Sequence, residues 1–119
     1  MQAKILLVDD EADLLVLMKA KLTRQGHAVI TSLNGEHLLD SVIRTKPDLI
    51  LMDITMKGVD GGTCCYLLKT SNCTQHIPVI LFSGNTNLQS IGALCKADGI
   101  LAKPYDAMAF QQMLERFIA

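Results

Sequence analysis

Four short apolar runs of this sequence end in side chains that together offer ligands for a divalent cation and a phosphoryl group. The side chains are three carboxylates, one hydroxyl and one ammonium group: Asp9, Asp10, Asp53, Ser83 and Lys103. Carboxylate oxygens are ligands that Mg²⁺ prefers, together with waters and phosphate oxygens. A carboxylate can also act as the nucleophile of a phosphoryl transfer, and an ammonium group neutralises phosphoryl oxygens as a point charge. The residue types therefore indicate metal-assisted phosphoryl chemistry.

The apolar runs before these residues have the length of buried parallel strands. They cover residues 5–8, 49–52, 79–82 and 99–102, and polar or turn-forming residues bound each of them. Ligands of an open α/β sheet bind beyond the carboxyl ends of its strands. We therefore expect the five side chains to meet at one edge of a parallel sheet.

Segments with the apolar spacing of helices separate the strands. The predicted strands cover about 4–8, 27–31, 48–52, 79–82 and 99–102, with a loop over 54–59. The first predicted helix covers about 11–25 and ends at Gly26. Asn34 and Asp60 are the expected caps of a second and a third helix, residues 88–95 have the spacing of a fourth, and Asp106 is the expected cap of the last. Their predicted inward faces hold Leu14, Leu15, Met18 and Leu22; Leu38, Leu39, Val42 and Ile43; Cys64, Leu67 and Leu68; and Phe110, Met113, Leu114, Phe117 and Ile118. Five βα units with right-handed crossovers predict a doubly wound α/β fold with helices on both sheet faces.

Length and composition favour one domain over residues 1–119 with an aliphatic core. The chain is 50% hydrophobic but only 4% aromatic, and its formal charge is -1. Without a basic excess, we expect no direct binding to nucleic acid and no attraction to an anionic membrane. No apolar run approaches the ~20 residues of a membrane span, and no signal-peptide pattern is present. We therefore expect a cytoplasmic protein.

Four cysteines raise the alternative of a zinc site. Cys64, Cys65, Cys73 and His76 offer zinc ligands, but they lack the usual paired spacing of two residues. The other interpretation, which we favour, is that the cysteines, including Cys95, are free thiols in a reducing compartment.

The motifs in their order closely resemble the receiver domain of bacterial response regulators. They are Leu7-Val8-Asp9-Asp10-Glu11, Asp53, Met56, Asp60-Gly61, Ser83-Gly84 and Lys103-Pro104, and the resemblance covers essentially the whole chain. It implies a flavodoxin-like (βα)5 fold whose five-stranded parallel sheet has the order 2-1-3-4-5, an order for which a receiver of this family is a known example.

The resemblance also implies a role for each site residue. Asp53 is the expected phosphoacceptor, which receives a phosphoryl group from a histidine kinase or a phosphotransfer protein. Mg²⁺, with Mn²⁺ as a substitute, is expected to bind Asp9, Asp10, Asp53 and the main-chain carbonyl of Thr55. Lys103 and Ser83 are expected to contact the phosphoryl oxygens. Such a domain is a signalling switch and not a turnover enzyme, and its output goes to a downstream protein or a fused output domain through its fourth helix, fifth strand and fifth helix.

Two positions depart from the family pattern. Ile100 occupies a position that usually holds an aromatic switch residue, and Lys57 replaces the usual proline after Met56. Ile100 keeps open the alternative of a phosphate-independent protein-interaction module. Two further alternatives fit less well. A haloacid-dehalogenase type of phosphatase needs an acid where Thr55 stands, and an FMN binder needs a Ser-, Thr- or Gly-rich loop where Asp9, Asp10 and Glu11 stand.

Overall fold

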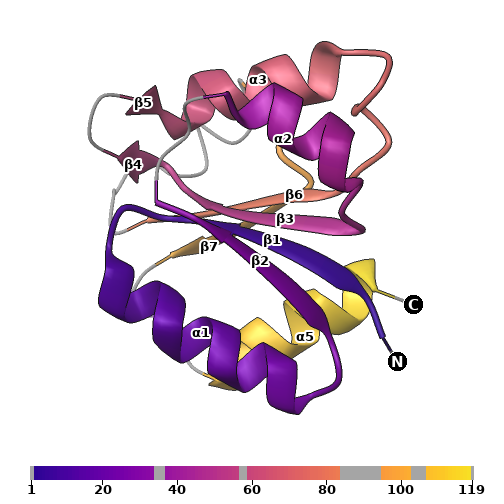
Figure 1. The fold of residues 1–119 in the computed structure, drawn as a ribbon. Helices are drawn as coiled ribbons and strands as arrows, with labels where there is room; N and C mark the ends of the chain where they lie inside the picture. Colours follow the sequence, from indigo (N-terminus) through magenta and orange to yellow (C-terminus); the bar gives the residue numbers. More distant parts are fainter. Residues whose placement is uncertain (1, 34–36, 57–58, 84–94, 103–106, 119) are drawn as a thin grey trace.

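The computed structural model describes residues 2–33, 37–56, 59–83, 95–102 and 107–118. A five-stranded parallel sheet lies in the middle, with helices above and below it (Figure 1). Its strands are β1 (Lys4–Val8), β2 (Ala28–Ser32), β3 (Leu49–Asp53), β6 (Val79–Ser83) and β7 (Gly99–Ala102). The spatial order β2-β1-β3-β6-β7 confirms the predicted order 2-1-3-4-5.

The described helices divide between the two faces of the sheet. Helices α1 (Ala12–Arg24) and α5 (Ala107–Phe117) cover one face, and α2 (Leu38–Thr45) and α3 (Gly61–Thr70) cover the other (Figure 1). The predicted helix over 88–95 lies outside the described residues except for Cys95, which is buried. The predicted doubly wound α/β class is therefore confirmed.

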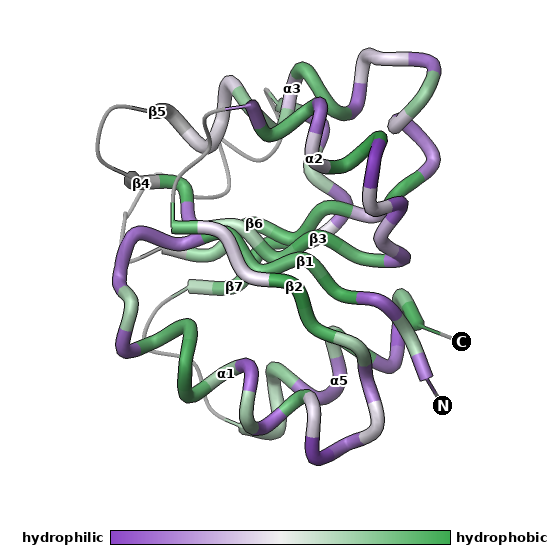
Figure 2. The backbone as a smooth tube through the Cα atoms, in the orientation of Figure 1, coloured by the Kyte–Doolittle hydropathy of each residue, from purple (hydrophilic) through white to green (hydrophobic). Residues whose placement is uncertain are grey.

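Alternate residues of the strands supply the two core layers, as a pleated strand buried on both faces requires. Leu6, Ile50 and Leu81 pack toward α2 and α3. Ile5, Leu51 and Phe82 pack toward α1 and α5. The central strands are accordingly hydrophobic along nearly their whole length (Figure 2).

Several helix predictions are confirmed and others are wrong. The predicted inward faces of α1 and α5 are buried or half-buried, and Gly26 adopts a left-handed φ of 100° after α1. Ile43 and Leu67, which we predicted to face inward, are 43% and 53% exposed. Cys65 is buried in place of Leu67, because α3 turns residues 61, 64, 65 and 68 toward the sheet.

The segment after β3 was predicted as a loop, but it contains two short antiparallel strands. They are β4 (Thr55–Met56) and β5 (Val59–Asp60), and Thr55 pairs with Asp60. Strand β3 also extends one residue further than predicted, to Asp53 itself. Of the predicted caps, Asn34 and Asp106 lie outside the described residues, and His37 is the residue that precedes α2.

Side-chain acceptors hold the amino ends of neighbouring strands together. His27 Nδ1 accepts a hydrogen bond from Ala3 N at 3.1 Å, and Asp48 Oδ2 accepts one from Lys4 N at 2.8 Å. Asp98 Oδ2 accepts one from Val79 N at 2.9 Å and forms an ion pair with Lys69 Nζ at 2.7 Å. Neighbouring strands therefore start in register without leaving these backbone donors unpaired.

Among the described residues, no helix has both the length and the apolar character needed to cross a bilayer.

Candidate metal and phosphoryl site

Strand register brings the predicted carboxylates to one edge of the sheet. Val8 pairs with Met52 between the parallel strands β1 and β3, so Asp9 follows at the level of Asp53. The Asp9 N–H donates to Ser32 O at 3.1 Å, which fixes the backbone at this point. Asp10 follows at the turn into α1. The structure therefore brings together the three aspartates that the sequence predicted to meet.

The three carboxylates form a compact and largely buried cluster. One oxygen from each of Asp9, Asp10 and Asp53 lies within 4.8 Å of the others. Asp9 is 0% exposed, Asp53 is 5% exposed and Asp10 is half-buried. Burying like charges this close together is costly unless cations or hydrogen-bond donors compensate them. A donor set made only of carboxylate oxygens is the set that a hard divalent cation such as Mg²⁺ selects.

Local backbone bonds orient Asp9 at the start of α1. Its Oδ1 accepts a hydrogen bond from Glu11 N at 2.9 Å, as an aspartate does when it caps a turn or a helix. Glu11 itself makes no side-chain capping bond. Asp9 therefore combines the structural role of capping with a place in the carboxylate cluster, and the second role does not exclude the first.

Gly61 lets the first turn of α3 approach the acceptor strand closely. A Cβ at Gly61 would collide with Asp53 O and would lie 2.7 Å from Ile54 Cα. Gly61 N also donates to Ile54 O at 2.9 Å. This glycine is needed because it lets two backbone segments meet, and it thereby sets the position of Asp53. The sequence analysis quoted Asp60-Gly61 as a motif without assigning this packing role.

The remaining predicted site residues differ in how much of them the structure describes. Ser83 ends β6 and pairs in register with Ala102, the residue just before Lys103, but its side chain lies outside the description. Thr55 begins β4, two residues after Asp53. Lys103 and Lys57 lie outside the described residues. Ile100 is half-buried and packs against the core layer on the α2 and α3 side.

The cysteines form no metal centre in the part of the chain that the structure describes. All four are free thiols: Cys64, Cys65 and Cys95 are buried and Cys73 is exposed. The aspartate cluster is the one group of three or more metal-binding side chains among the described residues. Burial raises the pKa of the Cys65 thiol well above its ordinary range, and Cys95 beside it acts in the same direction. The thiol of Cys65 is thus protonated and a poor metal ligand.

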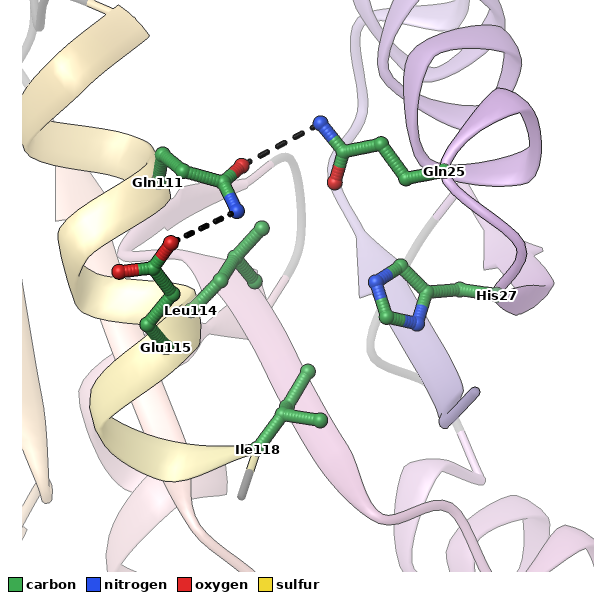
Figure 3. A pocket seen from close by; sticks show the side chains of 6 residues that line it. All are labelled: Gln25, His27, Gln111, Leu114, Glu115 and Ile118. Carbon is green, nitrogen blue, oxygen red and sulfur yellow. Dashed lines mark hydrogen bonds between the residues drawn. The ribbon is translucent and has the colours of Figure 1, made fainter. Parts of the chain in front are cut away.

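A shallow cavity at the opposite end of the sheet from this site is lined by three polar side chains that are linked by hydrogen bonds (Figure 3). Gln25 Nε2 donates to Gln111 Oε1 at 3.2 Å, and Gln111 Nε2 donates to Glu115 Oε1 at 3.5 Å. Partial burial lowers the pKa of His27, which lines the same cavity. This favours the neutral imidazole, whose Nδ1 accepts from Ala3 N.

Sequence comparison identifies the family. The profile of the response regulator receiver domain matches residues 5–115. The chain belongs to this receiver family. The response regulator PleD of Caulobacter vibrioides is 38% identical over 110 residues, which are 89% of this chain and 24% of PleD. The protein PilG of Pseudomonas aeruginosa is 30% identical over 104 residues, which are 86% of this chain and 77% of PilG.

Solved receiver domains have the same fold. The receiver domain of a signal transduction histidine kinase from Syntrophus aciditrophicus has a TM-score of 0.89 at 27% identity and covers 98% of this chain and 89% of its own. The receiver domain of the sensor histidine kinase PA1611 from Pseudomonas aeruginosa has a TM-score of 0.88 at 25% identity, covering 99% of this chain and 98% of its own. That structure holds a magnesium ion in its active-site cleft.

Membership defines the general role of the domain. Receiver domains of two-component systems are signalling domains that bind Mg²⁺ at an acidic pocket, and histidine kinases phosphorylate them. In this receiver, Asp9, Asp10 and Asp53 form an acidic cluster. The chain spans about a quarter of PleD and 44% of the transcriptional regulatory protein PhoP of Bacillus subtilis, so receivers of this family also occur joined to further domains.

Proposed function

We propose that this receiver is a phosphoacceptor switch in which Asp53 receives a phosphoryl group from a phosphohistidine. One observation carries the proposal: Asp9, Asp10 and Asp53 place carboxylate oxygens within 4.8 Å of one another, and two of the three residues are buried. A receiver fold alone does not require such a cluster, and a protein that uses only its surface gains no stability from it.

The chain's own residues are assigned to separate tasks in the transfer. A carboxylate oxygen of Asp53 attacks phosphorus as the bond from phosphorus to the donor imidazole nitrogen breaks, and the freed imidazole takes a proton from solvent. Lys103 neutralises the phosphoryl oxygens, and the Ser83 hydroxyl donates a hydrogen bond to one of them after transfer. Each transfer consumes the donor's phosphoryl group, so the protein catalyses its own modification and is not a turnover enzyme.

The acidic residues are also the proposed cation ligands. Asp9, Asp10, Asp53 and the main-chain carbonyl of Thr55 would hold Mg²⁺, with Mn²⁺ as a substitute. When bound, the cation supplies positive charge between carboxylates and phosphoryl oxygens that otherwise repel. The proposed donor is a histidine kinase or a phosphotransfer protein, and the proposed recipient is a downstream protein or a fused output domain. Direct binding to nucleic acid or membrane is not part of the proposed function.

The output is proposed to run through the face that contains β7 and α5. Ser83 and Ala102 are paired in register, so a shift of Ser83 toward a phosphoryl group is transmitted directly to β7. Ile100 packs against the core and has no ring to rotate, so the change takes the form of a backbone shift in place of an aromatic rotamer change.

Ile100 is also the observation that favours a second candidate, a receiver that binds partners without phosphorylation. Its half-buried side chain packs against a core layer, so we expect it to keep one position with and without a phosphoryl group on Asp53. In that case the output face keeps one conformation, whether or not Asp53 carries a phosphoryl group.

Intact-protein mass spectrometry after incubation with acetyl phosphate and Mg²⁺ tests the two candidates. We expect the parent protein to gain one phosphoryl group, the Asp53→Asn variant to gain none, and Asp13→Asn, an exposed aspartate of α1, to behave as the parent. Absence of the gain in the parent, with Mg²⁺ binding intact, would reject the phosphoacceptor and favour the interaction module.

A further inference from the structure

Helices α2 and α3 leave large apolar side chains exposed to solvent. Among the described residues of these helices, Ile43 is 43% exposed, Tyr66 is 47% exposed and Leu67 is 53% exposed. Two of them, Ile43 and Leu67, follow the apolar spacing of their helices yet face away from the sheet. The two helices lie side by side above the sheet (Figure 1), and Leu67 of α3 lines a cavity together with Leu38 and Leu39 of α2.

Two cavities lie along α2. The first, of about 190 Å³, lies between Leu38 and Leu39 on α2 and Cys64, Leu67 and Leu68 on α3. The second, of about 730 Å³, lies at the carboxyl end of α2, where Val42, Ile43 and Pro47 meet Ile77 and Pro78. Leu38 and Val42 of α2 are four residues apart, and so are Leu39 and Ile43, so both cavities open on one side of that helix.

Among the described residues, two lysines and one aspartate lie at or beside the second cavity. Lys46 and His76 line it, and the exposed Lys46 stands in a left-handed conformation at the end of α2 with φ 50°. Among the described residues that line the cavity, Asp48 is the one carboxylate, and it accepts a hydrogen bond from Lys4 N at 2.8 Å. Lys4 Nζ donates to Thr45 O at 3.0 Å close by. Lys4 thus adds another cation beside the cavity, which would attract carboxylates of a partner.

We propose that the α2/α3 face, defined by Leu39, Ile43, Leu67 and the two cavities, docks an amphipathic acidic helix of a partner protein. Helix-in-groove recognition uses apolar anchors at i, i+3, i+4 and i+7. Helix α2 has 8 residues and is ~12 Å long, so anchors two turns apart on one partner helix reach both cavities. The acidic end of that helix lies beside Lys46 and Lys4.

This face shares no residue with the aspartate cluster. None of Asp9, Asp10 and Asp53 lines either cavity. The second cavity lies at the amino ends of β3 and β6, away from the carboxyl ends where phosphoryl chemistry is proposed. Docking on this face therefore does not require phosphorylation, and its test is independent of the one described for Asp53.

A displayed library of helical peptides tests the proposal. The peptides carry Leu at i, i+3, i+4 and i+7, with the other positions randomised among Glu, Gln and Lys. Selection on the parent protein is compared with selection on Ile43→Gln/Leu67→Gln and on a matched control, Val16→Gln/Leu17→Gln, which changes two exposed apolar residues of α1. Alkylation of Cys73, the exposed cysteine among four and a lining residue of the second cavity, then reports occupancy of that cavity.

We expect selected peptides to be enriched in Glu at one end and to slow the alkylation of Cys73. They should bind the α2/α3 variant about tenfold more weakly and the α1 variant as the parent. Lys46→Glu should reverse the preference from Glu to Lys. Enrichment without a charge preference, equal binding to both double variants, or no enrichment would overturn the proposal. Concentration-dependent self-association that is lost in Ile43→Gln/Leu67→Gln would overturn it in favour of a second copy as the occupant.

Discussion

The acidic side chains at the two ends of the central sheet are arranged in opposite ways. At the amino end, Asp48 and Asp98 each accept a hydrogen bond from the backbone of a neighbouring strand, and Asp98 also pairs with Lys69. At the carboxyl end, Asp9, Asp10 and Asp53 bring three carboxylates together, although backbone donors reach Asp9. The amino end therefore uses its acids singly to bond neighbouring strands, and the carboxyl end gathers three acids in one cluster.

This contrast separates acids that bond neighbouring strands from acids that are the proposed cation ligands. Pairing an acid with a backbone N–H and a lysine stabilises the native state directly. Clustering buried acids destabilises it until a cation binds, and such local instability is typical of functional sites. Substitutions at the two ends should consequently have opposite signs, and the following predictions test that.

The largest effect is expected from Mg²⁺ at the carboxyl end. At a free concentration a hundredfold above its Kd, a ligand that binds only the native state stabilises it by ~2.7 kcal/mol. Asp9→Asn should abolish this gain, while raising the free energy of unfolding without Mg²⁺, because it removes one like charge and keeps an acceptor for Glu11 N. Urea unfolding with and without Mg²⁺ measures both effects.

The matched substitution at the amino end is Asp48→Asn, which should keep the full response to Mg²⁺. An equal loss of the response in both variants would show that the carboxylate cluster is not the cation site.

A smaller loss of stability is expected when the contacts of Asp98 with Val79 N and Lys69 Nζ are removed. Lys69 is 10% and Asp98 32% exposed at the side chain, so the pair is only partly screened. Asp98→Ala should lower the free energy of unfolding by about 2 kcal/mol, because it leaves Val79 N and Lys69 Nζ without this acceptor. Asp98→Asn should cost less, since the amide oxygen still accepts from Val79 N. If urea unfolding shows no difference between Asp98→Ala and the parent, the contacts of Asp98 do not stabilise the fold.

A pH-dependent effect is expected at His27. Partial burial lowers its pKa below the ordinary 6.5, so the unfolded chain binds the proton more readily than the native protein. The stabilisation by neutral His27 is complete above pH 6.5, declines as the pH falls through that value and levels off below the folded pKa. The step should not exceed about 1 kcal/mol, the usual worth of one hydrogen bond. Thermal unfolding of the parent and His27→Phe at several pH values measures it, and a step that persists in His27→Phe belongs to another group.

The smallest expected effect is a gain in stability on substitution of Lys46, which follows the last residue of α2. Its left-handed φ of 50° is unfavourable for a residue with a Cβ, so Lys46→Gly should raise the free energy of unfolding by about 0.5 kcal/mol after the added entropy of the unfolded chain is counted. Lys96→Gly, at φ 64°, is the parallel case beside Asp98. Urea unfolding of both variants checks the sign, and a loss at Lys46 would show that its side chain contributes more than its backbone conformation costs.

Local patterns in the sequence predicted the buried strands and the carboxylate cluster, whereas the strand order was implied by the family resemblance. Apolar runs such as 49–52 indicated strands buried on both faces, and an aspartate directly after such a run must lie at the carboxyl edge. Helical spacing likewise predicted the buried faces of α1 and α5. These predictions hold because the period of the side chains follows from the backbone geometry of each element alone.

Other features depend on residues that are distant in sequence, and only the tertiary structure decided them. The bonds of His27, Asp48 and Asp98 join residues separated by 24, 44 and 19 positions. The exposure of Ile43 and Leu67 depends on how α2 packs beside α3, because helical spacing defines a face but not the neighbour that covers it. The sequence by itself thus determined where the acids of the proposed phosphoryl site gather. Tertiary packing decided which other acids stabilise the fold and which apolar face stays open to a partner.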